Sequence, residues 1–376
     1  MGGVSMEWKE VTISDIANLK NGKKRPSEPG VIPVFGGNGI MDYVNSFNGE
    51  DTIVIGRVGA YCGCVYLSKG KCWVSDNAIA AKAKEDNDNE YLYYLLSSLN
   101  LNYHHIGGAQ PLMTQDIIGR IEVIVPQTKD DQRRIASILS SLDRKIELNN
   151  KINADLEEMA QAIFKNWFVD FEPFKDGKFV DSELGMIPEG WKVGSPYEYA
   201  KVVYGAPYKS AKFNDNGEGL PLIRIRDLKD CNPQFYTPEI LPQTEYVNMG
   251  DIVAGMDAEF VPHIWKGNTG LLNQRVCKLM PQQTSISNLF VLYLMKPELE
   301  FVQSYKTGTT VSHLGKADID KFVVVLPPLE VVEECSKILD SILQRIKNIS
   351  AESRTLSLLR DTLLPRLMSG ELEIPE

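Results

Sequence analysis

Two basic segments carry the side chains with the clearest chemical use in this sequence. Residues 20–26 read Lys-Asn-Gly-Lys-Lys-Arg-Pro, and residues 204–212 read Tyr-Gly-Ala-Pro-Tyr-Lys-Ser-Ala-Lys. An Ile-Arg-Ile-Arg run at 223–226 predicts a strand with both arginines on one face. A solvated loop would explain each segment alone, but their recurrence favours phosphate contacts. The candidate residues are Lys20, Lys23, Lys24, Arg25, Tyr208, Lys209, Lys212, Arg224 and Arg226.

Two glycine-containing turns could add hydrogen-bonding groups. Residues 107–113 read Gly-Gly-Ala-Gln-Pro-Leu-Met, and residues 307–313 read Thr-Gly-Thr-Thr-Val-Ser-His. Glycine lets a backbone approach a ligand closely, and short polar side chains can read base edges or hold phosphates. Ordinary loop chemistry remains the alternative. The candidates are Gln110, Thr309 and Thr310, with Arg57 and Asn77 as weaker members of the same kind.

Motifs for catalysis or cofactor binding are missing from the sequence. Gly315 and Lys316 are followed by Ala317 and do not make a phosphate loop, and no GxGxxG, HExxH or GxSxG pattern occurs. The Leu-Pro-Pro-Leu run at 326–329 is apolar where an amino-methyltransferase needs hydrogen-bonding groups. We therefore expect no catalytic residue in this chain and no cofactor bound by it.

The cysteines and histidines do not have the spacing of a metal site. Cys62 and Cys64 are separated by one residue, and the nearby Cys72 has no matching histidine. Structural zinc needs four ligands at compact spacing, so we expect no metal and small buried thiols instead. The histidines are scattered as His104, His105, His263 and His313.

Length and charge set broad limits on the protein. A chain of 376 residues is comfortable for two hydrophobic cores. It shows neither a run long enough for a membrane helix nor a secretory signal, so we expect a cytoplasmic protein with no membrane partner. Its net charge of −10 argues mildly against a polyanionic partner, but phosphate affinity depends on where lysine and arginine cluster.

The sequence repeats itself at a spacing of nearly 200 residues. Four landmarks recur in one order, which indicates a tandem duplication of a globular domain followed by a helix. Short apolar runs between glycine-rich turns predict mainly strands, with helices at about 89–99 and 287–295. The landmark pairs are Trp8 with Trp191, residues 51–56 with 251–255, residues 116–126 with 318–327, and residues 138–139 with 338–339.

Apolar periodicity predicts a long helix from about 130 to 168 and a second one near the C-terminus. Asn149, Asn150 and Asn153 interrupt the first apolar stripe, and such polar positions can fix the register of paired helices. The first helix would span roughly 58 Å. If the two pair antiparallel, one globular domain lies at each end of a rod, although the stripes could also dock separate subunits. The candidate interface residues are Ile138, Leu142, Ile146, Leu156, Ile163, Ile338, Ile342, Ile346, Leu359 and Leu363.

The whole chain resembles the specificity subunits of type I restriction-modification systems. The resemblance is carried by the order and duplication of its segments, above all residues 121–139, 143–150 and 364–372. The second copy departs from the pattern at 331–335, where Val-Val-Glu-Glu-Cys stands in place of a Gln-Arg-Arg-Ile run.

This resemblance implies an α+β fold with two β-rich target-recognition domains separated by a pair of long antiparallel helices. Each domain would read one half of a bipartite target in double-stranded DNA. The helices would set the spacer and dock two modification subunits, and restriction subunits would join the complex. S-adenosylmethionine, ATP and Mg²⁺ are expected on those partners. The implied boundaries are 1–127 and 187–327 for the domains, 128–169 and 328–376 for the helical spacers, and 170–186 for a linker.

Two other classes of protein remain possible at this point. A DNA-modifying enzyme with an unrecognised site would transfer methyl groups without a partner. A coiled-coil scaffold would bind proteins and not DNA, as the negative charge mildly favours. Salt-dependent DNA binding separates the scaffold from a DNA reader, because phosphate contacts weaken steeply with added salt.

Overall fold

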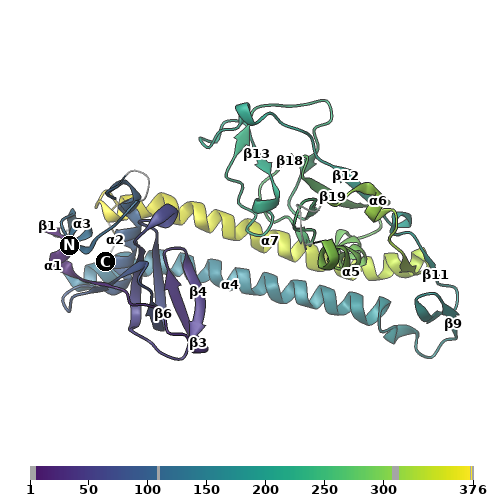
Figure 1. Ribbon diagram of the computed structural model, residues 1–376, viewed down its shortest axis with the longest axis horizontal. Helices are drawn as coiled ribbons and strands as arrows, with labels where there is room; N and C mark the ends of the chain where they lie inside the picture. Colours follow the sequence, from purple (N-terminus) through teal and green to yellow (C-terminus); the bar gives the residue numbers. More distant parts are fainter. Residues whose placement is uncertain (1–5, 108–110, 307–312, 373, 375–376) are drawn as a thin grey trace, which may run out of the picture. The chain divides into compact units, whose positions relative to one another are not determined.

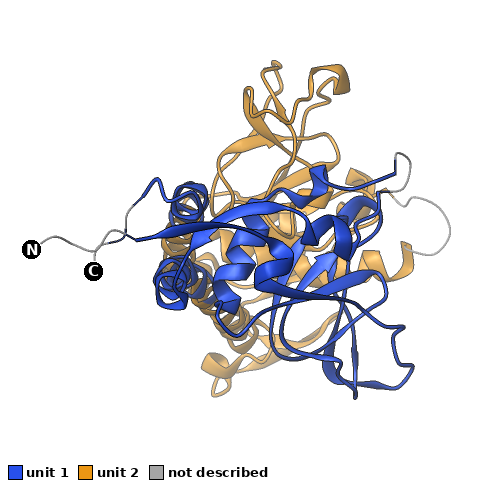
Figure 2. Cartoon of the chain, turned by 90° about the vertical axis from the view of Figure 1, so that its left-hand side faces the viewer, with its two compact units in different colours: residues 1–147, 355–376 blue, residues 148–354 orange. Residues whose placement is uncertain are grey.

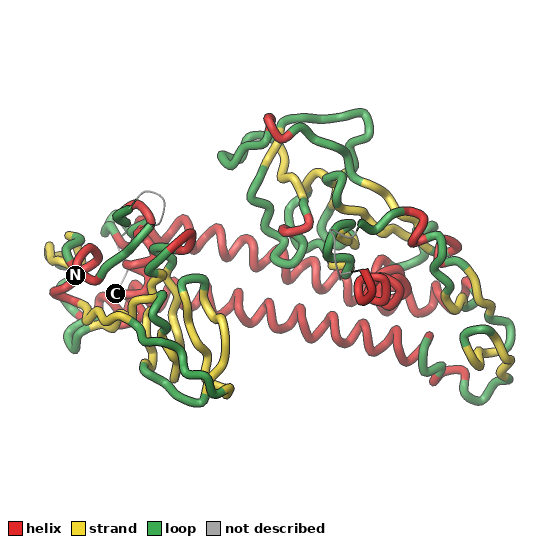
Figure 3. The backbone as a smooth tube through the Cα atoms, in the orientation of Figure 1, coloured by secondary structure: helices red, strands yellow, loops and turns green. Residues whose placement is uncertain are grey.

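Two compact units make up the chain in this computed structural model, which describes residues 6–107, 111–306, 313–372 and 374 (Figure 2). Unit 1 comprises Met1–Glu147 and Thr355–Glu376, and unit 2 comprises Leu148–Arg354. Both boundaries fall inside long helices (red in Figure 3), so each unit holds one β-rich part and a segment of each helix.

The β-rich part of unit 1 is a six-stranded sheet with the order β2-β7-β5-β6-β3-β4. β3 and β6 pair in parallel, and the other neighbours are antiparallel. Side chains alternate between the two faces of a strand, so Ile53 and Ile55 enter the main core while Val54 enters a smaller cluster. The strands are β2 (Ala17–Asn21), β3 (Pro29–Gly36), β4 (Gly39–Val44), β5 (Gly49–Gly56), β6 (Val65–Val74) and β7 (Ala78–Ala83).

Helix α2 (Asn89–Ser98) contributes Tyr91, Leu92 and Leu96 to the main core of unit 1. Its first turn is capped by the Asp88 carboxylate, which accepts hydrogen bonds from two backbone amides at 3.0 and 2.9 Å. This helix confirms the one predicted at 89–99. The remaining elements are α1 (Ile13–Ile16), α3 (Gln115–Gly119), the 3₁₀ turns η1 (Gly59–Tyr61) and η2 (Leu101–Tyr103), and an antiparallel pair of β1 (Trp8–Thr12) and β8 (Glu122–Pro126).

Unit 2 contains two four-stranded sheets, with the orders β12-β19-β16-β17 and β14-β13-β18-β15. The first contains β12 (Ala200–Tyr204), β16 (Ile252–Gly255), β17 (Pro262–Ile264) and β19 (Val276–Pro281). The second contains β13 (Leu220–Ile223), β14 (Tyr236–Thr237), β15 (Tyr246–Val247) and β18 (Gly270–Leu272). A separate antiparallel pair joins β11 (Lys192–Gly194) to β20 (Val324–Leu326).

Helix α5 (Asn288–Lys306) buries Leu289 and Phe290 in the core of unit 2. It is longer than the helix predicted at 287–295, because it continues through Pro297 with Leu299 and Val302 also buried. The short elements of unit 2 are α6 (Lys316–Ile319) and the 3₁₀ turns η3 (Glu172–Phe174), η4 (Pro196–Glu198), η5 (Ser210–Lys212) and η6 (Ile225–Asp227).

Equivalent close backbone approaches in the two units confirm the predicted duplication. A Cβ added to Gly22 would lie 1.9 Å from the carbonyl oxygen of Ser75. In unit 2, a Cβ added to Gly205 would lie 2.1 Å from the carbonyl oxygen of Asn273. No side chain fits at either glycine, so the same close backbone contact is formed twice with different neighbours.

The long helices α4 (Lys129–Phe168) and α7 (Leu329–Met368) are each 40 residues long (Figure 1). Within unit 2 the side-chain amide of Asn149 donates to Glu352 Oε2 at 2.8 Å, and that of Asn153 donates to Ser350 Oγ at 3.1 Å. Numbers rise along one helix as they fall along the other, so the two segments run antiparallel there.

Each long helix also accepts a hydrogen bond from the residue just before a shorter helix in its own unit. Gln132 of α4 accepts the backbone N–H of Asp88 at 2.8 Å, just before α2. Ser336 of α7 accepts the backbone N–H of Ser287 at 3.0 Å, just before α5. A buried amide without a partner costs free energy, so one polar residue on each long helix stabilises the unit locally.

The helix stripes pack mostly on the β-rich part of their own unit, and not only on each other. Phe164 of α4 and Ile342 and Ile346 of α7 belong to the main core of unit 2, together with α5. Ile338 and Leu359, predicted for the helix pair or for a subunit interface, are 41% and 44% exposed and so are not buried between the helices. Their contact with a separate subunit stays a prediction. The other candidate interface residues are half-buried: Ile138, Leu142, Ile146, Leu156, Ile163 and Leu363.

The connector after α4, for which the resemblance implied a linker at 170–186, packs on the protein surface through its aromatic residues. Phe171 and Phe174 lie edge-on to Trp191, with ring centroids 5.3 and 5.1 Å away. A hairpin of β9 (Phe179–Ser182) and β10 (Gly185–Pro188) follows, so this segment is ordered structure with a small sheet of its own.

All six cysteines are free thiols, and four of them are buried: Cys62, Cys72, Cys277 and Cys335. The prediction of small buried thiols is confirmed for these four. Across the described residues, every helix is too short or too polar to cross a membrane.

Candidate nucleic-acid interface

The basic segment of unit 1 begins on β2, at the edge of the six-stranded sheet. Lys20 lies opposite Ala80 of β7, and Lys23 forms an isolated parallel bridge with Ser75. The close approach at Gly22 holds the start of this segment against the end of β6. The four predicted basic side chains are all exposed: Lys20, Lys23, Lys24 and Arg25.

Only one of those four side chains has an acidic partner in the described part of the chain. Arg25 Nη1 lies 2.5 Å from Asp42 Oδ2, and both side chains are 45% exposed. An exposed ion pair adds little stability, about 0–1 kcal/mol, but it does offset the charge of the arginine. Lys20, Lys23 and Lys24 therefore carry the positive charge that this segment can offer to a phosphate.

The corresponding segment of unit 2 is tied to one carboxylate. The backbone N–H of Lys209 donates to Glu239 Oε2 at 2.9 Å, and Lys212 Nζ lies 2.8 Å from Glu239 Oε1. These contacts, with the backbone amide contributing most, lower the pKa of Glu239 below its ordinary value. Lys209 and Lys212 remain exposed, although Glu239 offsets part of their charge.

Tyr208 is part of the core, contrary to the prediction that it contacts DNA. Its side chain is 6% exposed, and its hydroxyl lies 3.0 Å from Thr244 Oγ1. It packs with Ala206, Leu222 and Leu271. A tyrosine so enclosed cannot reach a phosphate without rearrangement of the cluster.

The prediction that Arg224 and Arg226 share one face of a strand is wrong. β13 ends at Ile223, and residues 225–227 form the 3₁₀ turn η6. Asp227 fixes this turn by accepting the backbone N–H of Arg224 at 3.0 Å. The Arg224 guanidinium lies over the Phe235 ring, 4.3 Å from its centroid, so only Arg226 is exposed.

Arg57 follows β5 at a junction bonded through its backbone. Its N–H donates to the carbonyl of Asn77 at 3.0 Å, and its carbonyl accepts from the N–H of Met113 at 2.8 Å. The side chain is half-buried and donates weakly to the Asp76 carbonyl at 3.5 Å. Its Nε is buried without a hydrogen-bond partner in the described part of the chain.

The same two hydrogen bonds occur in unit 2 between other residue types. The N–H of Met256 donates to the carbonyl of Arg275 at 2.9 Å, and its own carbonyl accepts from Leu314 at 2.7 Å. Met256 therefore occupies the position of Arg57, and Arg275 occupies that of Asn77. Each unit therefore has one arginine in this hydrogen-bonded pair. In unit 1 it is the residue whose N–H donates, Arg57, and in unit 2 it is the residue whose carbonyl accepts, Arg275.

Sequence reasoning missed Arg275 and its two neighbours. Arg275 Nη1 lies 2.9 Å from Asp257 Oδ2, and His313 Nδ1 lies 2.8 Å from Asp257 Oδ1. The repeat carries a signal for Arg275, because Asn77 is a sequence candidate and Arg275 lies 198 residues later, close to the repeat spacing. The candidates Gln110, Thr309 and Thr310 lie outside the described residues.

A family model described as the type I restriction modification DNA specificity domain matches residues 6–158 and 188–356. The two matches cover both repeats and most of the chain. The chain belongs to this family. Its fold is α+β, with two β-rich domains in tandem and long helical segments, as the sequence predicted.

Relatives within this specificity-domain family match over most of the chain. The MjaIX specificity subunit of Methanocaldococcus jannaschii is 27% identical over 77% of this chain and 70% of its own length. The HindI specificity subunit of Haemophilus influenzae is 24% identical over 75% of this chain and 77% of its own. A crystal structure of the type I S subunit from M. genitalium has the same fold, with a TM-score of 0.58 and 16% identity over 99% of this chain and 98% of that one.

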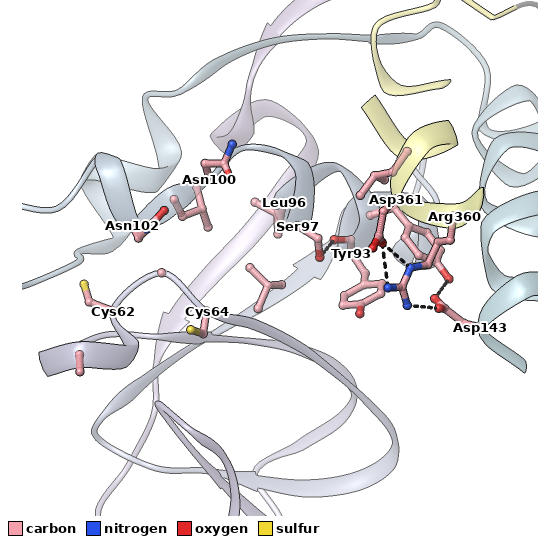
Figure 4. Close-up of a pocket in the computed structure, with 16 residues that line it drawn as sticks. Cys62, Cys64, Tyr93, Leu96, Ser97, Asn100, Asn102, Asp143, Arg360 and Asp361 are labelled. Atoms are coloured by element: carbon pink, nitrogen blue, oxygen red, sulfur yellow. Dashed lines mark hydrogen bonds and ion pairs between the residues drawn. The ribbon is translucent and has the colours of Figure 1, made fainter. Parts of the chain in front are cut away.

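Unit 1 of this specificity-domain protein also contains a pocket of about 490 Å³ beside α2 (Figure 4). Arg360 lies at its edge, 2.7 Å from Asp143 Oδ1 and 2.8 Å from Asp361 Oδ1. Tyr94 donates to Asp143 Oδ2 at 2.5 Å, and burial first, then this bond, raises the pKa of Tyr94. Two carboxylates already surround the one cation, so the network is suited to joining α2 to the helix segments of unit 1.

Proposed function

We propose that this chain is the DNA-reading, non-catalytic subunit of a type I restriction-modification complex. Each β-rich part reads one half of a bipartite, asymmetric target in double-stranded DNA. The observation that carries this proposal is the repeated junction at Arg57 and Met256, where one backbone scaffold presents different side chains in the two units. Two readers of unlike sequences require such a combination.

Local charge agrees with DNA as the partner despite the net charge of −10. Lys20, Lys23 and Lys24 are exposed on one segment, and none of them forms an ion pair with an acidic side chain in the described part of the chain. Phosphate contacts fix the register of a protein on DNA, while contacts to base edges supply sequence discrimination. In this proposal the lysines position unit 1, and side chains at the repeated junctions discriminate between bases.

The helix segments supply the spacing and the docking in this proposal. Several apolar side chains on α4 and α7 are exposed, among them Leu358 at 70% and Met159 at 52%. Exposed apolar residues on a helix suit contact with partner helices. Two modification subunits would dock there and restriction subunits would complete the complex, with S-adenosylmethionine, ATP and Mg²⁺ held by those partners.

Coexpression of this chain with its neighbouring modification subunit tests the proposal. Methylated adenines mapped across the host genome are expected to define one motif of two unlike half-sites around a fixed spacer. Neither subunit alone is expected to methylate. Methylation by this chain alone would support an enzyme. A complex that neither methylates nor binds DNA at any salt concentration would support a scaffold.

A further inference from the structure

We propose that Arg275 is a specificity-determining residue of unit 2, positioned by Asp257 to read a guanine in the half-site of that unit. This inference rests on the proposed function and adds a residue and a base to it. In the major groove, arginine bonds to O6 and N7 of guanine through two parallel donors, which is the commonest specific contact of this kind.

Arg275 is held at one end and exposed at the other. Its Nη1 lies 2.9 and 3.3 Å from the two carboxylate oxygens of Asp257. Among the described residues, no partner of Nε or Nη2 is found, and the side chain is 53% exposed. A guanidinium fixed through one nitrogen keeps its remaining donors in a defined direction, which lowers the entropy lost when it binds a base.

Asp257 is suited to positioning because it is itself enclosed. Its side chain is 17% exposed and contacts both Arg275 and His313. The His313 ring lies 2.8 Å from Asp257 Oδ1, on the oxygen that Arg275 approaches less closely. A carboxylate with a partner on each oxygen has little freedom to rotate, so it can fix the direction of the guanidinium.

Comparison with unit 1 indicates that these side chains are not needed for the fold. Asp257 and His313 form an isolated antiparallel bridge, and Val58 and Leu112 form the same bridge in unit 1. The bridge is thus formed by apolar residues in unit 1 and by charged or titratable residues in unit 2. Since the two units are proposed to read different sequences, differences at equivalent places in one scaffold are where discrimination is expected.

The junction also lies beside the basic segment of unit 2. The N–H of Gln274 donates to the carbonyl of Ala206 at 3.0 Å, which joins the residue before Arg275 to segment 204–212. Lys209 and Lys212 of that segment are exposed. A base-reading arginine next to phosphate-binding lysines is the usual division of contacts on a DNA surface.

The equivalent position in unit 1 allows a base-exchange test. Asn77, which is exposed, replaces Arg275 there, and asparagine offers the donor and acceptor that suit adenine. The variants are Arg275→Ala, Arg275→Lys and Arg275→Asn, each prepared as a complex with the modification subunit. Arg226→Ala removes an exposed arginine of the same unit outside this cluster. Because Arg226 is a candidate phosphate contact, it serves as the control for loss of a positive charge without loss of base reading.

Binding is measured on duplexes that carry the wild-type motif, with each G·C pair replaced in turn by A·T. Wild type is expected to discriminate at one G·C pair of one half-site by about 5- to 100-fold. Arg275→Ala should abolish discrimination at that pair alone, Arg275→Lys should weaken it, and Arg275→Asn should shift preference toward A·T. Arg226→Ala should leave the discrimination at every position unchanged, with any loss of affinity equal for all duplexes.

Asp257 is tested through its coupling to Arg275. Asp257→Ala should reduce discrimination at the same base pair, and the double variant should lose no more than Arg275→Ala does. Matching thermal unfolding midpoints of the complexes would exclude a folding defect. If wild type shows no motif, the proposed function fails; if it shows a motif that all Arg275 variants keep, only this inference is overturned.

Discussion

Asn153 of α4 donates its side-chain amide to the hydroxyl of Ser350 on α7 at 3.1 Å, and both side chains are at least 95% buried. One turn earlier, Asn149 bonds to Glu352 in the same way. These contacts lie where the sequence showed a polar break in an apolar stripe. Because a buried polar pair is satisfied in one alignment of the helices, it favours that register over a shifted one.

Ser350→Ala is therefore expected to lower the free energy of unfolding by about 1–3 kcal/mol, because the buried Asn153 amide loses its acceptor. Denaturant titration of the purified chain measures the change. Ser353→Ala is the matched control on the same helix, since the buried Ser353 hydroxyl has no hydrogen-bond partner among the described residues. Equal losses in the two variants would contradict a role for the Asn153 bond.

The repeated junction makes a second stability prediction at Gly56 and Gly255. A Cβ at Gly56 would lie 2.0 Å from the carbonyl oxygen of Tyr61, and one at Gly255 would lie 2.2 Å from that of Glu259. Since backbone must move in both cases, Gly56→Ala and Gly255→Ala should each destabilise the protein by about 1–3 kcal/mol or more.

Gly37→Ala is the control for this pair, because its nearest neighbour would be 3.6 Å away, an ordinary contact. We expect its free energy of unfolding to stay within about 0.5 kcal/mol of that of the wild type. If alanine were tolerated at Gly255 but not at Gly56, the two junctions would not be equivalent.

Lys23→Ala combined with Lys24→Ala should weaken DNA binding and flatten its salt dependence. Each lost phosphate contact reduces the slope of log affinity against log salt by about 0.9, so two contacts account for about 1.8. Fluorescence anisotropy at several salt concentrations measures the slope. Lys175→Ala with Lys178→Ala removes equal charge from the connector of unit 2, and the prediction requires that this pair leave the slope unaltered.

The architecture could be predicted because two regular spacings in the sequence determine it, that of the repeat and that of the apolar residues in the helices. A recurring spacing near 200 residues reveals a duplication without any knowledge of the fold, and apolar residues at helical spacing located α4 to within a residue of its first turn. Position along the stripe was less informative. Ile338 fits the helical spacing and is exposed, because neighbouring positions on α7 already fill the core of unit 2.

The site was less predictable because residue type does not reveal what surrounds a side chain. Arg224 looked like a free cation in the sequence, but Asp227 and the Phe235 ring enclose it. Tyr208 looked like a contact residue and fills a small core. The surroundings of Arg275 could not be predicted, because its partners Asp257 and His313 come from separate segments of the chain.

Changing the length of both long helices should change the spacer of the DNA target and neither half-site. Four residues add about 6 Å to a helix, and a base pair occupies about 3.4 Å, so the spacer should lengthen by one or two base pairs. Insertions after Glu147 in α4 and after Arg354 in α7 fall at the unit boundaries, where neither β-rich core is interrupted. Genome-wide methylation by the coexpressed complex gives the spacer directly.

An insertion in α4 alone is the control, because it lengthens one helix and not the other. The facing residues on both sides of the insertion, Asn153 and Ser350 among them, then cannot all stay in register. Such a variant should lose stability and activity together, whereas the paired insertion keeps the facing residues in register. The same half-sites with a longer spacer in the paired variant would support a helical spacer between two readers. An unchanged spacer in an active paired variant would show that the distance between half-sites is set elsewhere.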